Sequence, residues 1–167
     1  MEHFDFNDGN GPVPAHRHPN GGGWVAETAI VADTASVGPY ARVYGDAWVY
    51  GDAWVYDNAR VYGNAWVSGT AQVFGSALVY GNASVYGNAR VSRTPKVLSG
   101  FKHTLTVTDN LVIAGCEAHP PSVWLERGPV IIRSDNISSA NATTQAAIIA
   151  AIIHAHGCVD SPQEDAQ

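Results

Sequence analysis

Valine recurs at every sixth position over residues 25–97, and this strict period is the feature that most constrains the fold. It occupies positions 25, 31, 37, 43, 49, 55, 61, 67, 73, 79, 85, 91 and 97, and alanine follows four residues later from Ala29 to Ala89. Gly-Asp or Gly-Asn pairs stand between them at 45–46, 51–52, 63–64, 81–82 and 87–88. Such residues tolerate positive φ and tight corners. Each unit therefore predicts a short strand centred on valine, a corner and a small inward residue.

Three such units form a triangular coil of 18 residues, and the twelve units give about four coils. Stacked coils pair as parallel strands about 4.8 Å apart, so each valine is expected to lie on the valine 18 residues later. A solenoid needs about three repeats for stability, and this chain exceeds that number. A chain of hairpins does not explain so strict a period. The sequence therefore predicts an all-β solenoid.

The Val-x-Gly-Asn/Asp-Ala-x units resemble the hexapeptide-repeat, left-handed parallel β-helix superfamily, best known through its acyltransferases. The resemblance covers residues 25–97. It implies left-handed coiling, an exception to the right-handed crossover rule, and assembly as trimers. The head, DFNDGNGPVPAHRHPNGGGWVAETA, is similar to the start of uncharacterised hexapeptide-repeat proteins of phages and prophages.

Caps are expected at both ends, because open terminal coils expose unpaired backbone groups. We divide the chain into a cap of residues 1–24, the β-helix of 25–97, a small sheet plus helix of 98–158, and a disordered tail of 159–167. In the first cap, Pro12, Pro14, Pro19 and Gly21–Gly23 predict an irregular path.

Beyond Val97 the period stops, and a small cap of strands and one helix is expected. The predicted strands are residues 101–108, 111–116, 122–127 and 129–134. A helix with Asn141 or Thr143 as N-cap and Gly157 as its stop follows. We expect this helix to pack against the small sheet or another subunit.

The charge distribution argues against a nucleic-acid polymer as partner. Only 14% of residues are charged and the net charge is −6. Within 25–97, five acidic residues balance five basic ones, whereas phosphate-backbone binding needs clustered Lys and Arg. The chain has neither a basic, apolar leader nor an apolar run of membrane-spanning length, which predicts a protein of the cytoplasm, or of the host cytosol if phage-encoded.

Side chains on either side of each valine point outward, so residues 18 apart form columns on three faces. Face 1 carries Tyr44, Tyr62 and Tyr80 beside Arg42, Arg60, Leu78 and Lys96; face 2 carries Trp48 and Trp66 beside Tyr50, Ser68 and Tyr86; face 3 carries Trp54, Gln72 and Arg90 beside Tyr56, Phe74 and Ser92. One interpretation is ladder stacking plus a subunit interface. The other is binding of a base or sugar ring, with Arg42 or Arg60 engaging an anionic group.

The candidate contact residues on these faces are therefore Arg42, Tyr44, Trp48, Trp54, Arg60, Tyr62, Trp66 and Tyr80. Three functional hypotheses follow. The first is a non-catalytic trimeric binding or structural module of phage or mobile-element origin. The second is a binder of a nucleotide or sugar in pockets between subunits. The third is a CoA-dependent acyltransferase.

The acyltransferase hypothesis requires a histidine that can act as the general base. The resemblance implies a histidine base on a loop that projects from the coils. No histidine lies between Trp24 and Lys102, so His103 and His119 are the fallback bases, and each is equally a hydrogen-bonding strand or turn residue. His16 and His18 are weak candidates for a metal site with Asp5 or Asp8. No cofactor is expected.

Overall fold

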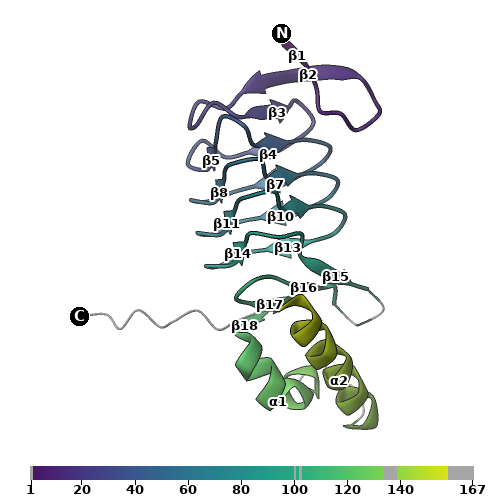
Figure 1. Cartoon of the computed structure of the whole chain (residues 1–167). Helices are drawn as coiled ribbons and strands as arrows, with labels where there is room; N and C mark the ends of the chain where they lie inside the picture. Colours follow the sequence, from purple (N-terminus) through teal and green to yellow (C-terminus); the bar gives the residue numbers. More distant parts are fainter. Residues whose placement is uncertain (1, 100, 102, 134–138, 158–167) are drawn as a thin grey trace, which may run out of the picture.

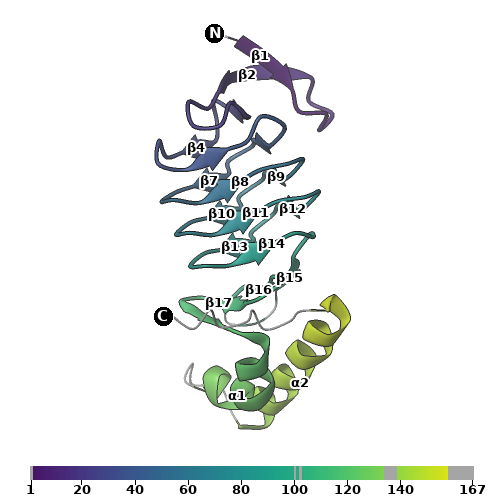
Figure 2. The same ribbon diagram turned by 60° about the vertical axis from the view of Figure 1, so that its left-hand side comes forward.

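Residues 24–91 form a β-solenoid of four coils, as the period of six predicts (Figures 1 and 2). The computed structural model describes residues 2–99, 101, 103–133 and 139–157. Each coil contributes one short strand to each of three parallel sheets. Face 1 contains β3 (Trp24–Ala26), β6 (Arg42–Val43), β9 (Arg60–Val61) and β12 (Leu78–Val79); face 2 contains β4 (Ile30–Val31), β7 (Trp48–Val49), β10 (Trp66–Val67) and β13 (Ser84–Val85); face 3 contains β5 (Ser36–Val37), β8 (Trp54–Val55), β11 (Gln72–Val73) and β14 (Arg90–Val91).

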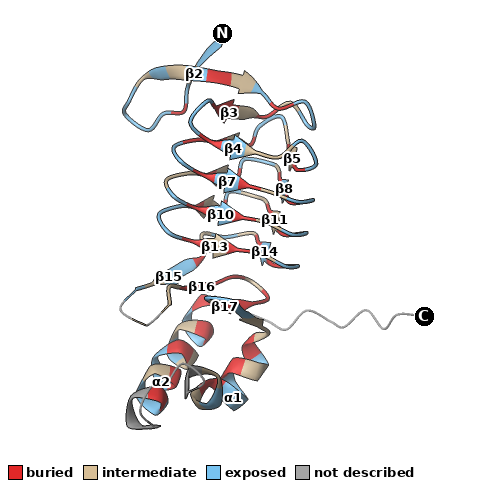
Figure 3. Cartoon of the chain, turned by 180° about the vertical axis from the view of Figure 1, so that it is seen from behind, coloured by how far each residue is buried: buried red, intermediate tan, exposed pale blue. Residues whose placement is uncertain are grey.

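The interior of the coils is a stack of valine and alanine. Val43 lies opposite Val61, and the same step of 18 residues pairs Val49 with Val67. Every repeated valine from Val37 to Val91 is fully buried, and the corner alanines are buried as well (Figure 3). Only small side chains fit three walls that approach this closely. The period of six thus sets both the strand register and the composition of the core.

Most of the N-terminal cap is a regular hairpin, so the predicted irregular path is wrong for Pro12 and Pro14, which lie in a strand. It is correct for Pro19 and Gly21–Gly23, which lie in the loop before β3, where Gly21 and Gly22 have positive φ. Strand β1 (Glu2–Asp5) pairs antiparallel with β2 (Pro12–Arg17), and β2 pairs antiparallel with β3. Proline lacks the backbone N–H group and has a fixed φ, but its carbonyl can still accept a hydrogen bond. The Pro14 carbonyl still accepts the Glu27 N–H at 3.0 Å, so the prolines do not prevent pairing.

The C-terminal cap departs further from the prediction. Strands β15 (Lys96–Leu98), β16 (Leu105–Val107), β17 (Val112–Ala114) and β18 (Glu117–His119) form an antiparallel sheet. Lys96 is therefore wrongly placed in the face 1 column, because β15 pairs with β16 and not with β12.

The predicted strands 122–127 and 129–134 are wrong, because residues Pro121–Arg133 form helix α1. Proline at the first helical position is preorganised for a helix. The decisive contacts are tertiary. A Cβ on Gly128 would stand 3.3 Å from the Cβ of Ala146 in α2 (Ser139–His156), and the Trp124 indole N–H donates to the Val112 carbonyl at 2.9 Å.

Helix α2 begins earlier than predicted, at Ser139, so the proposed N-caps Asn141 and Thr143 lie inside it. Its end is as predicted, because Gly157 follows with φ 69°. α2 packs on α1 and β16 with Ile149 and Ile153 buried. The predicted tail, 159–167, lies outside the described residues. Among the described helices, none has both the length and the apolar character needed to cross a membrane.

The two caps satisfy backbone groups that the end coils leave unpaired. Inside the stack, each coil donates N–H groups to the next, as Arg42 does to the Ala59 carbonyl at 3.1 Å. The last coil has no following coil, and side-chain oxygens replace it. The acceptors are Thr94 Oγ1 for the Leu78 N–H, Thr106 Oγ1 for Ser84, Asn110 Oδ1 for Arg90 and Asp109 Oδ2 for Ser92. At the other end, the Asn20 amide donates to the Ala35 carbonyl at 3.0 Å.

The corner glycines provide a matched test of coil stacking. Gly45 and Gly81 have φ of 67° and 63°, so alanine at either position adopts a left-handed conformation costing about 1–2 kcal/mol. A Cβ at Gly45 would also stand 2.9 Å from the Gly63 nitrogen of the next coil, whereas no atom lies within 4 Å at Gly81. We expect Gly45→Ala to lower the free energy of unfolding in urea more than Gly81→Ala. Equal losses would contradict the close approach of the coils.

Candidate interaction faces

Face 1 carries an aromatic ladder that the N-terminal head completes. Tyr44, Tyr62 and Tyr80 stack with ring centroids 4.9 and 5.2 Å apart and interplanar angles of 3° and 11°. Above them the face 1 residue is Ala26, and the Phe6 ring stacks on Tyr44 at 4.8 Å. Phe6 and Tyr44 are both buried within the single chain. The upper half of face 1 is therefore covered by the protein's own head.

The arginine column of face 1 is engaged by the same head. The Arg42 guanidinium lies 5.2 Å from the Phe4 ring centroid, and its Nη1 donates to the Phe6 carbonyl at 3.4 Å. Phe4 also stacks on Trp24 at 4.4 Å. Of the predicted contact residues on this face, Arg42 and Tyr44 thus serve the fold of the chain. The lower part of the face still offers Arg60 and Tyr62, which are half-buried, and Tyr80, which is 47% exposed.

The pKa of the Tyr44 phenol reflects its burial under the N-terminal head. Burial raises the pKa of Tyr44 above its ordinary value of 10.0, with a further contribution from Tyr62, while the Arg60 guanidinium acts in the opposite direction. Burial also raises the pKa of Tyr62, and the neighbouring Tyr80 adds to the effect. Both shifts favour the neutral phenols of Tyr44 and Tyr62.

Face 2 is aromatic, exposed and uncharged. Trp48 and Trp66 are 40% and 48% exposed, and their ring centroids lie 5.6 Å apart at 37°. Tyr50 meets Trp48 edge-on at 5.5 Å. The two columns of this face consist of Ile30, Trp48, Trp66 and Ser84 and of Tyr50, Ser68 and Tyr86, all of them uncharged. Apolar surface of this kind marks interaction sites.

Face 3 combines an exposed tryptophan with a cation. Trp54 is 54% exposed, and Tyr56 stacks on Phe74 at 5.2 Å and 6°. The Arg90 guanidinium lies 5.6 Å from the Phe74 ring centroid. Burial raises the pKa of Tyr56, and Arg90 opposes this shift. Face 3 is thus more polar than face 2. Its tryptophan column is interrupted, because Gln72 follows Trp54.

The structure does not assemble the predicted histidines into one site. His16 Nδ1 lies 2.7 Å from Glu27 Oε1, and the buried His18 ring lies 3.1 Å from the Asn20 carbonyl oxygen. The proposed partners are occupied elsewhere, since Asp5 bonds the Asn7 N–H and Asp8 bonds Asn10. Over the described residues, no group of three His, Cys, Asp or Glu side chains could hold a metal ion.

The fallback bases lie beside the last hairpin. The His103 imidazole lies against the backbone of Gly115, in the turn between β17 and β18, and His119 Nε2 lies 2.7 Å from Glu117 Oε2. Their role as acyltransferase bases stays a prediction.

Comparison with known proteins bears on the repeat itself. The family model described as YdcK Beta solenoid repeat matches residues 41–57 and 53–69. This chain is a β-solenoid repeat protein. The matched segments contain Trp48, Trp54 and Trp66, and they lie in the second and third coils. Searches of curated proteins and of solved structures returned no match. Left-handed coiling, hexapeptide-repeat ancestry and the phage relation stay predictions.

Sequence reasoning missed Phe4 and Phe6, the residues that close face 1. Their signal is the alternation Phe-Asp-Phe, which places two aromatic rings on one side of a strand. Nothing in the period of six indicates that this strand folds back along the ladder.

Phe6 should control the titration of Tyr44. In Phe6→Ala the Tyr44 ring loses its cover, so its pKa should fall towards 10.0, and the cap should lose about 3 kcal/mol of stability, as buried Phe→Ala changes do. Titration of labelled tyrosine rings by NMR measures this shift. Tyr56, whose pKa is also raised on another face, is the internal control and should not move. An unchanged Tyr44 would show that Phe6 does not provide the cover.

Proposed function

We propose that this β-solenoid is a non-catalytic structural and binding module that assembles as a homotrimer through face 2. The observation that carries the proposal is the exposure of Trp48 and Trp66 on an uncharged face. A monomer rarely leaves contiguous aromatic surface in water, because its burial stabilises association by about 25 cal/mol per Å². The number of three subunits rests on the resemblance to the hexapeptide-repeat superfamily. A phage or mobile-element origin rests on the similarity of the head alone.

The other faces support this choice. On face 1 the chain covers its own ladder with Phe6, so burial of these aromatic columns is already part of the fold. On face 3, Arg90 and Gln72 interrupt the apolar surface. Charged residues are depleted at the core of subunit interfaces, and tryptophan and tyrosine are enriched. Face 2 has this composition.

The oligomeric state tests the proposal directly. We expect light scattering to give three times the chain mass of 17.7 kDa. The double variant Trp48→Ser, Trp66→Ser should shift the mass to one chain, because an interface tryptophan contributes about 2 kcal/mol or more. Trp54→Ser is the matched control, since it removes a tryptophan of face 3 that is more exposed than either of these and should leave the oligomer intact. A monomeric parent protein, or dissociation by Trp54→Ser alone, would overturn the assignment to face 2.

A second candidate function is the binding of a ring-containing anionic ligand at the lower end of face 1. The rings of Tyr62 and Tyr80 are stacked with nearly parallel planes, and Tyr80 leaves almost half of its surface exposed. Phe6 shows at the other end that this ladder accepts one more aromatic ring. Arg60 lies beside the same ladder and could pair with a phosphate or carboxylate.

A substitution of Arg60 distinguishes ligand binding on face 1 from assembly through face 2. If the site binds a nucleotide or a sugar that carries an anionic group, the unfolding temperature should rise when the ligand is added. Arg60→Gln should abolish that rise while the mass by light scattering is unchanged. Arg90→Gln removes an arginine beside an aromatic ring on face 3 and should keep the response. A panel without any shift for the parent protein would rule out this second function and leave the face 2 assembly untouched.

A further inference from the structure

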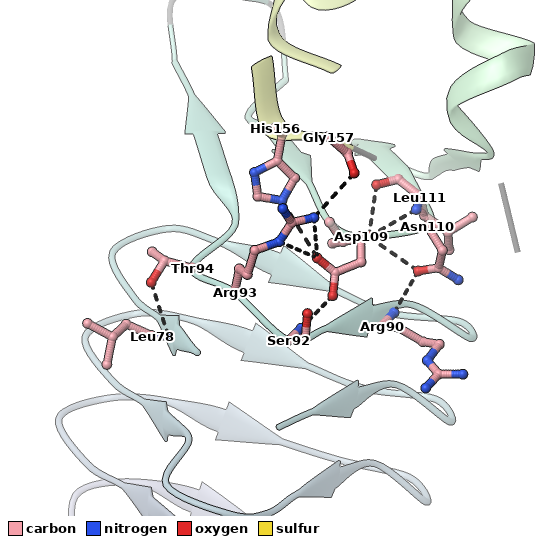
Figure 4. A network of polar contacts seen from close by, with 11 residues as sticks. Leu78, Arg90, Ser92, Arg93, Thr94, Asp109, Asn110, Leu111, His156 and Gly157 are labelled. Carbon is pink, nitrogen blue, oxygen red and sulfur yellow. Dashed lines mark hydrogen bonds and ion pairs between the residues drawn. The ribbon is translucent and has the colours of Figure 1, made fainter. Parts of the chain in front are cut away.

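The end of α2 is fastened to the last coil through Asp109 and Arg93. Asp109, in the turn between β16 and β17, accepts the Ser92 N–H of the last coil. Its other oxygen lies 3.4 Å from both Nε and Nη2 of Arg93 (Figure 4). Arg93 Nη2 also donates to the Gly157 carbonyl at 3.3 Å, just beyond the last turn of α2. Asp109 and Arg93 thus connect the solenoid, the hairpin and the helix end.

His156 lies buried in this junction with an unsatisfied nitrogen. The side chain is 6% exposed, and its Nε2 has no hydrogen-bond partner among the described residues. The nearest carboxylate oxygen, Asp109 Oδ1, lies 3.9 Å away, beyond hydrogen-bond distance. Asp109 is already occupied by Ser92 and Arg93. The neutral imidazole is therefore held by packing, and only a protonated ring would form an ion pair with Asp109.

Three charged groups act on this imidazole from the elements around it. Burial lowers the pKa of His156 below its ordinary value of 6.5, Arg93 and Lys96 lower it further, and Asp109 acts in the opposite direction. On its own helix, His154 is exposed to solvent two residues earlier. The neutral ring is thus the form that fits the closed junction.

We propose that His156 is an acid-sensitive latch whose protonation releases α2 from the end of the solenoid. In the closed state the ring is neutral. In the open state it titrates near 6.5, so the open state binds more protons as the pH falls below that value. The contribution of the neutral ring to the stability of the closed state is therefore fully present above about pH 6.5. This contribution is lost as the pH falls towards the lower pKa of the closed state.

Release would uncover an apolar cluster while the coils stay capped. α2 packs Ile149 and Ile153 against Trp124 and the residues of β16. The last coil keeps its other side-chain acceptors, Thr106 and Asn110, which do not contact His156 through any described hydrogen bond. Acid would thus open the helical cap and leave the faces of the solenoid in place. This device is independent of the function proposed for face 2.

Hydrogen exchange at residue level tests the latch in the full chain. Between about pH 7.5 and about pH 5, protection factors of α2 amides should fall by on the order of tenfold per pH unit within the titration window, as for one linked proton. Amides of the central coils, such as Val43 and Val61, should keep their protection. An NMR titration should place the His156 pKa below its ordinary value of 6.5.

Matched variants distinguish the latch from general acid lability. His156→Phe and His156→Gln should both remove the pH dependence of α2 protection, whereas His154→Gln should retain it. Asp109→Asn keeps an acceptor for Ser92 but removes the charge that favours protonation, so it should enlarge the acid-induced loss. The proposal is overturned if α2 protection is unchanged or rises on acidification, if the coils lose protection in parallel, or if both His156 variants retain the loss.

Discussion

Coil-on-coil pairing at a step of 18 residues is the constraint from which the other features follow. Each valine is stacked on its counterpart, and the N–H groups that point along the stack are bonded to carbonyls of the next coil in every coil but the last. A shift by one residue would turn the whole valine column outward. The corners therefore have to be equal in length. From Gly45 to Gly87 each corner uses a glycine with positive φ, except at Asp57, which takes the same conformation with φ 55°. The first coil instead has Glu27, Asp33 and Pro39 at the equivalent positions.

The same register determines what the surface can do. Because residues 18 apart are forced into contact, any aromatic residue placed beside a valine becomes part of a ladder. The chain uses this in two ways. On face 1 it ends the ladder with Phe6 and buries Tyr44. On face 2 it leaves Trp48 and Trp66 in solvent. A repeated core thus gives three surfaces that differ in function although their backbones are alike.

The sequence predicts the coils well because the information is local and repeated. Three neighbouring valines already determine a coil, and every further unit confirms the same register. The caps lack this redundancy. Whether residues 121–133 become strand or helix depends on Gly128 meeting Ala146 and on the Trp124 bond to Val112, contacts that no short window contains. The cover of Tyr44 by Phe6 and the burial of His156 depend on the same kind of distant contact.

The ends of a solenoid are also where chemistry can enter a structure whose middle is chemically uniform. A coil inside the stack satisfies its backbone with backbone, and its interior has no place for an ionisable group. The last coil must instead recruit side chains, and the acceptors that serve it include Asp109, which is charged. The half-exposed Arg93 pairs with this charged acceptor, and a buried, neutral His156 lies beside the pair. Capping a parallel ladder with a carboxylate therefore introduces titratable chemistry at the end of the rod, where a neutral cap such as Asn110 would not.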